Sequence, residues 1–470
     1  MCVMWYNFLM NFWTREHLSR ALTDVEFHNM PEDFSANGLR VHYSDFTLGN
    51  IALMKKQGEE VGIDEAYFKY FQDKVSAIMT TDEKYFSKYK LPIIKVKNTR
   101  DAVIMMAFYI RRLFEGKVVD ITGSCGKSTV TKMCYDVLEQ YGASANTNRS
   151  NINFSIAWNM TSYNPEAKYW VNETSLGGGM ELNSYLTKPD VSVITNIAPV
   201  HLAPKQTLDM VAVTKAKIFT AMRPNSYAVL YKETDYYEVL EQAAKEKQLN
   251  IITVGEADDC DIQIIIGETN YIKVFGCEYK FSEVPTAKHI LIDCALTFGV
   301  LYSLGLPIDP ALEILRNWSP IIGRGQVLIG EFYEGCNITM VDESFNANPL
   351  SMTSCLEGFG MTYQDKNKVL IIGDMAEGGV NTVAQHLQLV DVLRKVKPNI
   401  VLCCGEQIKV VWDELKREFC GSYYKSVNDL IPELNTWIKD GDCVFVKASH
   451  SIELFKITSN FRNSINKSQN

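Results

Sequence analysis

The sequence predicts an α/β protein of three domains. Three observations support this: the length of 470 residues, an alternation of apolar strands with helical stretches, and one glycine-containing loop between a strand and a helix. A single hydrophobic core rarely serves a chain of this length. We expect a small α/β N-terminal domain (1–115), a central P-loop domain with a parallel sheet (116–319) and a Rossmann-like C-terminal domain (320–470).

The elements expected in the N-terminal domain are a short helix at 14–22, a strand at 91–96 and an apolar-periodic helix at 99–114. In the central domain, strands alternate with helical stretches, as in a parallel sheet covered by helices. These strands are expected at 118–122, 169–172, 191–195 and 227–230. A long amphipathic helix at 289–304 precedes the third domain. That domain repeats the theme, with strands at 339–342, 369–373, 400–402 and 443–447.

Composition and charge exclude several classes of protein. Hydrophobic residues make up 46% of the chain and charged residues 22%, which is typical of a folded protein with a large core. The net charge of −9 argues against a nucleic-acid-binding surface, which needs clustered Lys and Arg. The apolar residues 1–13 lack a basic leader and are too short to span a bilayer. We therefore expect neither secretion nor membrane insertion.

The 12 cysteines are scattered and include no C-x-x-C pair, which indicates reduced thiols in a cytoplasmic protein. The adjacent pair Cys403 and Cys404 ends an apolar strand. We interpret this pair as small buried residues rather than as a redox centre.

A loop between strand 118–122 and the following helix predicts a phosphate-binding site. Its residues are Gly123, Ser124, Cys125, Gly126, Lys127, Ser128 and Thr129. Glycine lets the backbone N–H groups approach a phosphate at a helix N-terminus, Lys127 supplies charge and Ser128 can ligate Mg²⁺. The full G-x-x-x-x-G-K-[ST] pattern is not met, because Ile121 stands where its first glycine would be.

Two further side chains follow neighbouring strands of the same predicted sheet. Glu173 comes directly after strand 169–172, and His201 follows strand 191–195. Open α/β sheets place ligands beyond the carboxyl ends of their strands, so both side chains are expected at one crevice. A carboxylate there can hold Mg²⁺.

In this order Ser128, Glu173 and His201, followed by the segment 214–219, resemble the central domain of the Mur ligases. These are ATP-dependent enzymes that extend the peptidoglycan stem peptide. Residues 120–129 are similar to the shortened phosphate loop of that family, which accounts for Ile121. Residues 196–202 resemble its "N-x-A-x-x-H-L" string, and Gly323-Arg324 resembles its interdomain arginine.

The most specific strings lie in the third domain. Residues 342–352 are similar to "D-D-S-Y-N-A-N-P-x-S-M" and residues 373–377 to "G-D-M-x-E", both from the subfamily that adds D-Ala-D-Ala to a UDP-muramoyl tripeptide (MurF). Residues 147–153 resemble a substrate loop of the same subfamily. The resemblance covers about residues 91–457, and the first ninety residues match weakly.

The resemblance implies an amide ligase that uses ATP and two Mg²⁺ ions and forms an acyl-phosphate. It assigns catalysis to Lys127, Glu173, His201 and Lys215. It assigns the metals to Ser128, Glu173, His201 and a carbamylated Lys215. The nucleotide would be held by residues 123–129 and Asn346 and, when the C-terminal domain closes, by Arg324 and by Asp342 at the ribose. The substrates would contact Thr147, Asn151, Asn153, Asn348, Ser351, Lys447, Ser449 and His450.

Several residues depart from the family pattern at positions where the family binds its substrates and nucleotide. His450 and Ala448 replace the arginine and a glycine of "K-G-S-R-S", and Phe154 replaces an asparagine of the substrate loop. Ile290 and Asp293 replace the asparagines of "H-N-x-x-N". Histidine lacks the bidentate fork that arginine offers a carboxylate, so the identity of the incoming amine stays open.

Two alternatives follow from these departures. One is a relative that joins another amine to a carboxylate outside peptidoglycan. The other is a nucleotide-binding module without catalysis. The expected partners are small molecules, namely a carboxylate acceptor, which is UDP-linked if the chain acts on a UDP-muramoyl peptide, and an amine. The expected state is a monomer or weak oligomer.

Overall fold

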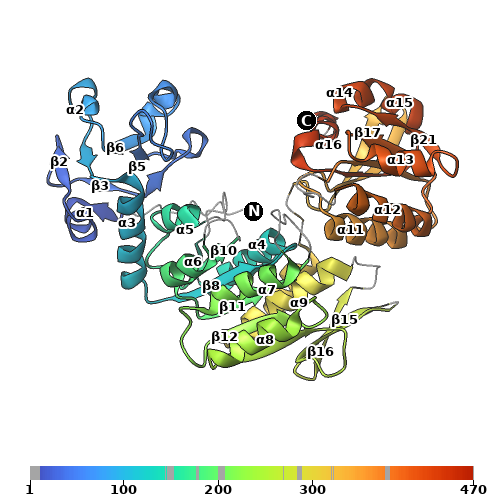
Figure 1. The fold of residues 1–470 in the computed structure, drawn as a ribbon, viewed down its shortest axis with the longest axis horizontal. Helices are drawn as coiled ribbons and strands as arrows, with labels where there is room; N and C mark the ends of the chain where they lie inside the picture. The colour runs from blue at the N-terminus through green and yellow to red at the C-terminus, as the bar shows by residue number, and fades with distance from the viewer. Residues whose placement is uncertain are drawn as a thin grey trace.

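The computed structural model describes residues 11–142, 144–145, 153–175, 179–198, 207–267, 269–282, 288–318, 320, 322–375 and 382–468. Three larger sheets with their own helices follow one another along this chain. In Figure 1 the N-terminal part (blue) and the C-terminal part (orange to red) stand apart above the central part. The expected α/β class is confirmed. We retain the boundaries 115/116 and 319/320 as a proposal.

The N-terminal domain contains a five-stranded sheet in the order β2-β7-β6-β5-β4 and a separate pair, β1 with β3. The strands are β1 (Trp13–Thr14), β2 (Glu26–His28), β3 (Ser35–Ala36), β4 (Leu39–Arg40), β5 (Asn50–Leu53), β6 (Val75–Thr80) and β7 (Ile93–Lys95). The helices are α1 (Arg15–Ala21), α2 (Lys84–Lys88) and α3 (Thr99–Leu113). Asn98 caps α3, because its side chain accepts a hydrogen bond from Asp101 N. The predicted helices at 14–22 and 99–114 are present.

The central domain is built on a nine-stranded sheet in the order β16-β15-β14-β13-β12-β11-β8-β10-β9. The strands are β8 (Lys117–Thr122), β9 (Ser144–Ala145), β10 (Tyr169–Glu173), β11 (Val191–Ile194), β12 (Tyr227–Tyr231), β13 (Asn250–Gly255), β14 (Ile262–Ile265), β15 (Asn270–Val274) and β16 (Cys277–Ser282). Strands β8 to β14 pair in parallel, whereas β15 and β16 are antiparallel.

The register of this sheet positions the predicted site. Glu173 pairs with Ile121 across β10 and β8, and Ile194 pairs with Thr122 across β11 and β8. The three strands therefore end side by side, and the loops that leave them start at one edge.

The helices of the central domain are α4 (Lys127–Leu138), α5 (Asn153–Met160), α6 (Met180–Thr187), α7 (Leu208–Ala216), α8 (Tyr237–Glu246), α9 (Lys288–Ser303) and α10 (Asp309–Arg316). The prediction that α9 is amphipathic is wrong. This helix packs against α4 and against strands β12, β13 and β14, and it is buried on most sides after its first turn. Apolar residues all around a helix are typical of a buried position.

The C-terminal domain has a six-stranded sheet in the order β17-β18-β22-β19-β20-β21. The strands are β17 (Gln326–Tyr333), β18 (Cys336–Asp342), β19 (Lys368–Gly373), β20 (Ile400–Cys404), β21 (Cys420–Tyr424) and β22 (Cys443–Lys447), and only β17 is antiparallel to its neighbour. The helices are α11 (Pro349–Thr362), α12 (Thr382–Val396), α13 (Lys409–Leu415), α14 (Val427–Leu430), α15 (Leu434–Trp437) and α16 (Phe455–Ser468). Apolar cores lie on both faces of the sheet.

Cys403 and Cys404 are fully buried free thiols in β20, which confirms their interpretation as small core residues. Burial raises the pKa of both thiols, to about 12 in the case of Cys404. A thiol that stays protonated is a poor nucleophile, so the pair is suited to packing rather than to redox chemistry. Within the described residues, no helix combines the length and apolar character needed to cross a membrane.

Candidate active site

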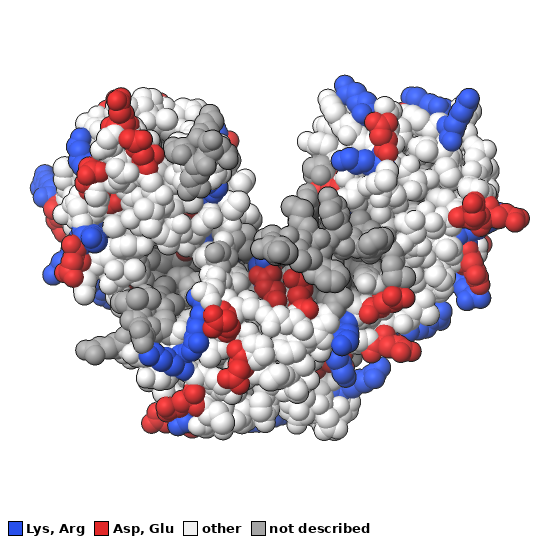
Figure 2. All heavy atoms as spheres, turned by 180° about the vertical axis from the view of Figure 1, so that it is seen from behind, with Lys and Arg blue, Asp and Glu red and all other residues white. Residues whose placement is uncertain are grey.

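A cavity of about 590 Å³ lies between the central and C-terminal domains. The phosphate loop, Glu173 and the first turns of α9 line it from the central domain, and Arg324, Glu343 and α11 line it from the C-terminal domain. The molecule is hollowed between its two outer domains (Figure 2). On the face shown there, Lys and Arg are scattered among acidic residues and form no continuous basic patch.

The phosphate loop turns sharply between β8 and α4, and two glycines make this turn possible. Gly126 precedes the first residue of α4 with a φ of 78°. Gly123 has a φ of 151°, and a Cβ at this position would lie 1.8 Å from Thr195 Oγ1. A side chain at residue 123 would therefore collide with the end of β11.

Hydrogen bonds tie this loop to the chain that follows β11. Ser124 N donates to Asn196 O over 2.9 Å, and Cys125 N donates to Asn196 Oδ1 over 2.8 Å. Ser124 Oγ donates to Ala198 O over 3.0 Å. The loop is thus held in place before any ligand binds, at the N-terminus of a helix that favours anions.

Two predicted lysines converge on this loop. Lys127 Nζ donates to Gly123 O over 2.9 Å, and Lys215 Nζ donates to the same oxygen over 2.6 Å. Lys215 is only 2% exposed. Burial, and then the nearby Lys127 ammonium, hold the pKa of Lys215 well below its usual range. Burial also lowers the pKa of Lys127, although the Glu173 carboxylate opposes this effect.

Glu173 is the last residue of β10 and, like Ser128, lines the cavity. The charge of its carboxylate favours the protonated forms of Lys127 and Arg324, and it therefore opposes the lowering of both pKa values by burial. Carboxylate and hydroxyl oxygens are the ligands that Mg²⁺ prefers. His201 lies outside the described residues, so its place at this site stays a prediction.

Arg324 reaches the cavity from the start of the C-terminal domain. Its guanidinium lies over the Phe345 ring, 4.2 Å from the ring centroid. Burial lowers the pKa of Arg324, while Glu173 and Glu343 raise it. An arginine between these two carboxylates remains charged and adds a second cation near the phosphate loop.

The prediction that Asp342 contacts a nucleotide is not supported by its position. Asp342 is fully buried, and its carboxylate is 2.5 Å from Arg462 Nη2 and accepts a hydrogen bond from Ser344 Oγ. It does not line the cavity, whereas the next residue, Glu343, does. Successive residues at a strand end point to opposite sides, so only one of the two acids can face the ligand.

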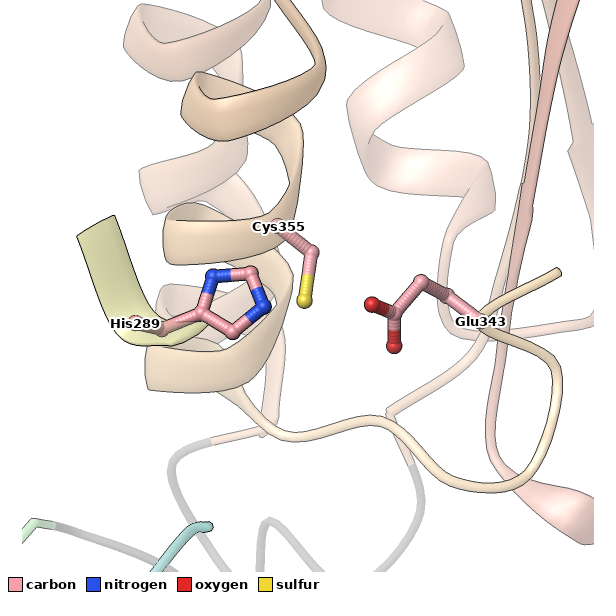
Figure 3. A group of neighbouring side chains, drawn as sticks. All are labelled: His289, Glu343 and Cys355. Carbon is pink, nitrogen blue, oxygen red and sulfur yellow. The ribbon is translucent and has the colours of Figure 1, made fainter. Parts of the chain in front are cut away.

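Glu343 stands in a group of side chains that the sequence did not single out. His289 from α9 and Cys355 from α11 lie beside it (Figure 3). Lys447 Nζ is 3.4 Å from Glu343 Oε2 and donates to Asn346 O over 2.9 Å. Burial alone lowers the pKa of Lys447, but Cys355 and Glu343 raise it above its usual value. The string 342–352 was the signal that could have pointed to this group.

Asp293 and Ile290 line the cavity at the start of α9, where the resemblance expects asparagines. Burial raises the pKa of Asp293 well above its usual range. A Cβ on Gly126 would lie 2.8 Å from Asp293 Oδ1, so the acid is packed against the phosphate loop.

The predicted substrate residues are divided between two places. Asn348, Ser351, Lys447 and the nucleotide residue Asn346 line the cavity. Asn348 and Ser351 also form a reciprocal cap on α11, with Ser351 N donating to Asn348 Oδ1 over 2.9 Å.

The structure does not bring Ser449 and His450 to the cavity. Ser449 Oγ donates to Ala347 O over 3.2 Å, and His450 stacks on Phe455 with 4.7 Å between ring centroids. The chain after β22 continues into a short helical turn at His450–Ile452, and the His450 ring lies 6.0 Å from the ring of Phe345, which does line the cavity. Thr147, Asn151 and the side chain of Asn153 lie outside the described residues.

Comparison with known proteins gives consistent matches. The profile of the Mur ligase middle domain matches residues 121–297, and that of the Mur ligase glutamate ligase domain matches residues 323–450. UDP-N-acetylmuramoyl-tripeptide–D-alanyl-D-alanine ligase of Rickettsia prowazekii is 25% identical over 462 residues, covering 96% of this chain and 100% of the relative. The Escherichia coli enzyme of the same name is 25% identical and covers 78% of this chain and 81% of its own.

Solved structures of the same kind share the fold. MurF from Acinetobacter baumannii superposes with a TM-score of 0.79 at 17% identity, covering 96% of this chain and 98% of that one. MurF from Thermotoga maritima, solved in complex with ADP, gives a TM-score of 0.73 at 19% identity, with coverage of 92% and 98%. At identities below 20%, these superpositions show a shared fold, and they support the three-domain architecture.

Proposed function

The chain belongs to the Mur ligase family, and on this premise we propose that it joins D-Ala-D-Ala to a UDP-muramoyl tripeptide at the expense of ATP. The observation that carries the proposal is the shared cavity. Lys127 and Glu173 from one domain line it together with Arg324 from the next. A relative named for this activity aligns along its whole length.

The residues present suit ATP and Mg²⁺. The phosphate loop offers backbone N–H groups at the N-terminus of α4. Thr195 leaves no room for a Cβ at residue 123, so this position of the loop requires glycine. Ser128 and Glu173 would hold Mg²⁺. When bound, this ion offsets charge on the transferring phosphoryl group. A second Mg²⁺ at His201 remains part of the proposal.

In the proposed reaction, an oxygen of the substrate carboxylate attacks the γ-phosphorus of ATP, and ADP leaves. The amine then attacks the carbonyl carbon of the acyl-phosphate, and inorganic phosphate leaves with the carboxylate oxygen. Lys127 and Arg324 stabilise the charge that develops on the phosphoryl oxygens, which is the main catalytic task in phosphoryl transfer. Because the reaction consumes ATP, we place it in the cytoplasm. A monomer or weak oligomer remains part of the proposal.

The test is incubation of the purified chain with ATP, Mg²⁺, UDP-muramoyl tripeptide and D-Ala-D-Ala. We expect ADP, phosphate and a product whose mass equals that of the two substrates less one water. If no product forms, the substrate assignment fails.

A second candidate is a family member with another amine. It is favoured by one observation: His450, where the resemblance expects an arginine, stacks on Phe455 outside the cavity. A panel of amino acids and dipeptides, scored by phosphate release, separates the two. ATP binding without turnover of any pair would instead indicate the non-catalytic module.

We further propose that Lys215 is carbamylated and serves as a carboxylate-like group near the phosphate loop. Its low exposure and lowered pKa favour the neutral amine, which is the form that attacks CO₂. Its Nζ already lies beside Gly123 at the loop. The carbamate would place a negative charge near the Lys127 ammonium, which would attract it.

Lys215→Ala is expected to lower kcat by about 10²-fold or more, because it removes a charged group from the site of phosphoryl transfer. Added acetate should restore part of the rate. The exposed Lys217, two residues away, is the matched control, and Lys217→Ala should leave kcat unchanged. A normal rate for Lys215→Ala would exclude the carbamate role.

A further inference from the structure

Three side chains of different chemistry meet at the boundary between two domains. His289 comes from α9 of the central domain, Glu343 directly follows β18 and Cys355 comes from α11. One donor atom of each lies within 4.8 Å of the donors of the other two. Figure 3 shows the imidazole, the sulfur and the carboxylate pointing toward one another.

This group has capacity to bind a ligand. Nε2 of His289 faces the sulfur and the carboxylate (Figure 3), whereas Nδ1, which is buried and has no hydrogen-bond partner among the described residues, lies on the other side of the ring. Cys355 is a free thiol and is 8% exposed. All three residues line the cavity of about 590 Å³, so an ion can reach them from solvent.

The donor set fits Zn²⁺ better than Mg²⁺. Imidazole nitrogen, thiolate and carboxylate are common zinc ligands, and three protein ligands leave one position open for water. Donor atoms around one Zn²⁺ lie about 3.3–3.8 Å apart, given metal–ligand distances of about 2.0–2.3 Å. Separations up to 4.8 Å therefore need a contraction of about 1 Å, which side-chain rotation can supply.

Lys447 opposes a cation here but does not block the site. Its Nζ lies 3.4 Å from Glu343 Oε2, so one carboxylate oxygen is shared with the ammonium. The carboxylate has a second oxygen. Metal binding also deprotonates the Cys355 thiol and releases the proton to solvent, which adds a second negative charge to the group.

We propose that His289, Glu343 and Cys355 form a Zn²⁺ site that joins the central and C-terminal domains and inhibits the ligase by fixing these domains around the cavity they line. The ion fixes the two domains, because its ligands come from both. Only the inhibition depends on the function proposed above. Zinc would thus act as an inhibitor, whereas Mg²⁺ serves the phosphate loop.

Cobalt substitution tests the site without any assay of activity. The full chain is titrated with Co²⁺ in excess Mg²⁺, and sulfur-to-cobalt charge-transfer absorption reports a thiolate ligand. We expect one equivalent of Co²⁺ with this band, displaced by Zn²⁺. Cys355→Ser should abolish the band, and His289→Gln should weaken Zn²⁺ binding by about tenfold or more.

Cys125→Ser is the matched control, because Cys125 is the other free thiol that lines the cavity. This variant should keep the band. Thermal unfolding of each variant checks that the chain is folded. Absence of the band in the wild-type chain, or its persistence in Cys355→Ser, would overturn the proposal.

A second measurement addresses inhibition. Ligase activity is followed at buffered free Zn²⁺ and saturating Mg²⁺ and ATP. The wild-type chain should lose activity, and Cys355→Ser should need at least about tenfold more Zn²⁺ for the same loss. Equal sensitivity of the two proteins would rule out this site as the inhibitory one.

Discussion

Lys127→Ala is expected to lower kcat by about 10³-fold while the chain stays folded. Lys127 is the cation in the first turn of α4, within the loop that we assign to phosphate. Removing one preorganised charge from a phosphoryl-transfer site costs about 10²–10³ in rate. Phosphate release under saturating substrates measures the effect.

Lys132→Ala provides the control on the same helix. Lys132 is more than one turn further along α4, where it pairs with Asp136 and does not line the cavity. Its loss should leave kcat within a factor of two or so, since surface ion pairs contribute little. Equal rates for Lys127→Ala and the wild-type chain would mean that the phosphate loop is assigned wrongly.

Glu173→Gln should have the second largest effect, a loss of about 10²-fold or more in kcat with a higher Mg²⁺ requirement. The change keeps the shape of the side chain but removes the charge that we expect to bind Mg²⁺. Glu173 ends β10 directly beside the phosphate loop, so glutamine there should disturb the backbone little. Initial rates across a series of Mg²⁺ concentrations measure both changes.

Glu181→Gln is the companion variant, because Glu181 is exposed in the first turn of α6 and does not line the cavity. It should keep the wild-type rate and the wild-type Mg²⁺ dependence. If Glu173→Gln shows the same unchanged Mg²⁺ dependence, then Glu173 is not a metal ligand.

Much of the sheet architecture could be predicted from the sequence, because buried parallel strands appear as continuous apolar runs. Strands 118–122, 369–373 and 443–447 fall on β8, β19 and β22 to within one residue. The position of Glu173 at the site could also be predicted, because this residue lies at the carboxyl end of such a strand. Helix α9 could not be described correctly, because its burial depends on the packing of α4 and the sheet around it.

The C-terminal side of the site was harder to predict. The choice between Asp342 and Glu343 depends on which of two adjacent acids faces inward, and the Arg462 that pairs with Asp342 is 120 residues away in the sequence. Likewise, His289 and Cys355 come from different domains, so no local pattern connects them. The strings that resemble the family located this region but did not assign the role of each residue.

The central claim is that this chain activates a carboxylate as an acyl-phosphate, and oxygen transfer tests it most directly. The acceptor carboxylate is labelled with ¹⁸O at both oxygens, and the inorganic phosphate released during amide formation is analysed by mass spectrometry. Because phosphate leaves with one carboxylate oxygen, each phosphate should carry one ¹⁸O atom. Amide formation with unlabelled phosphate would contradict the acyl-phosphate mechanism.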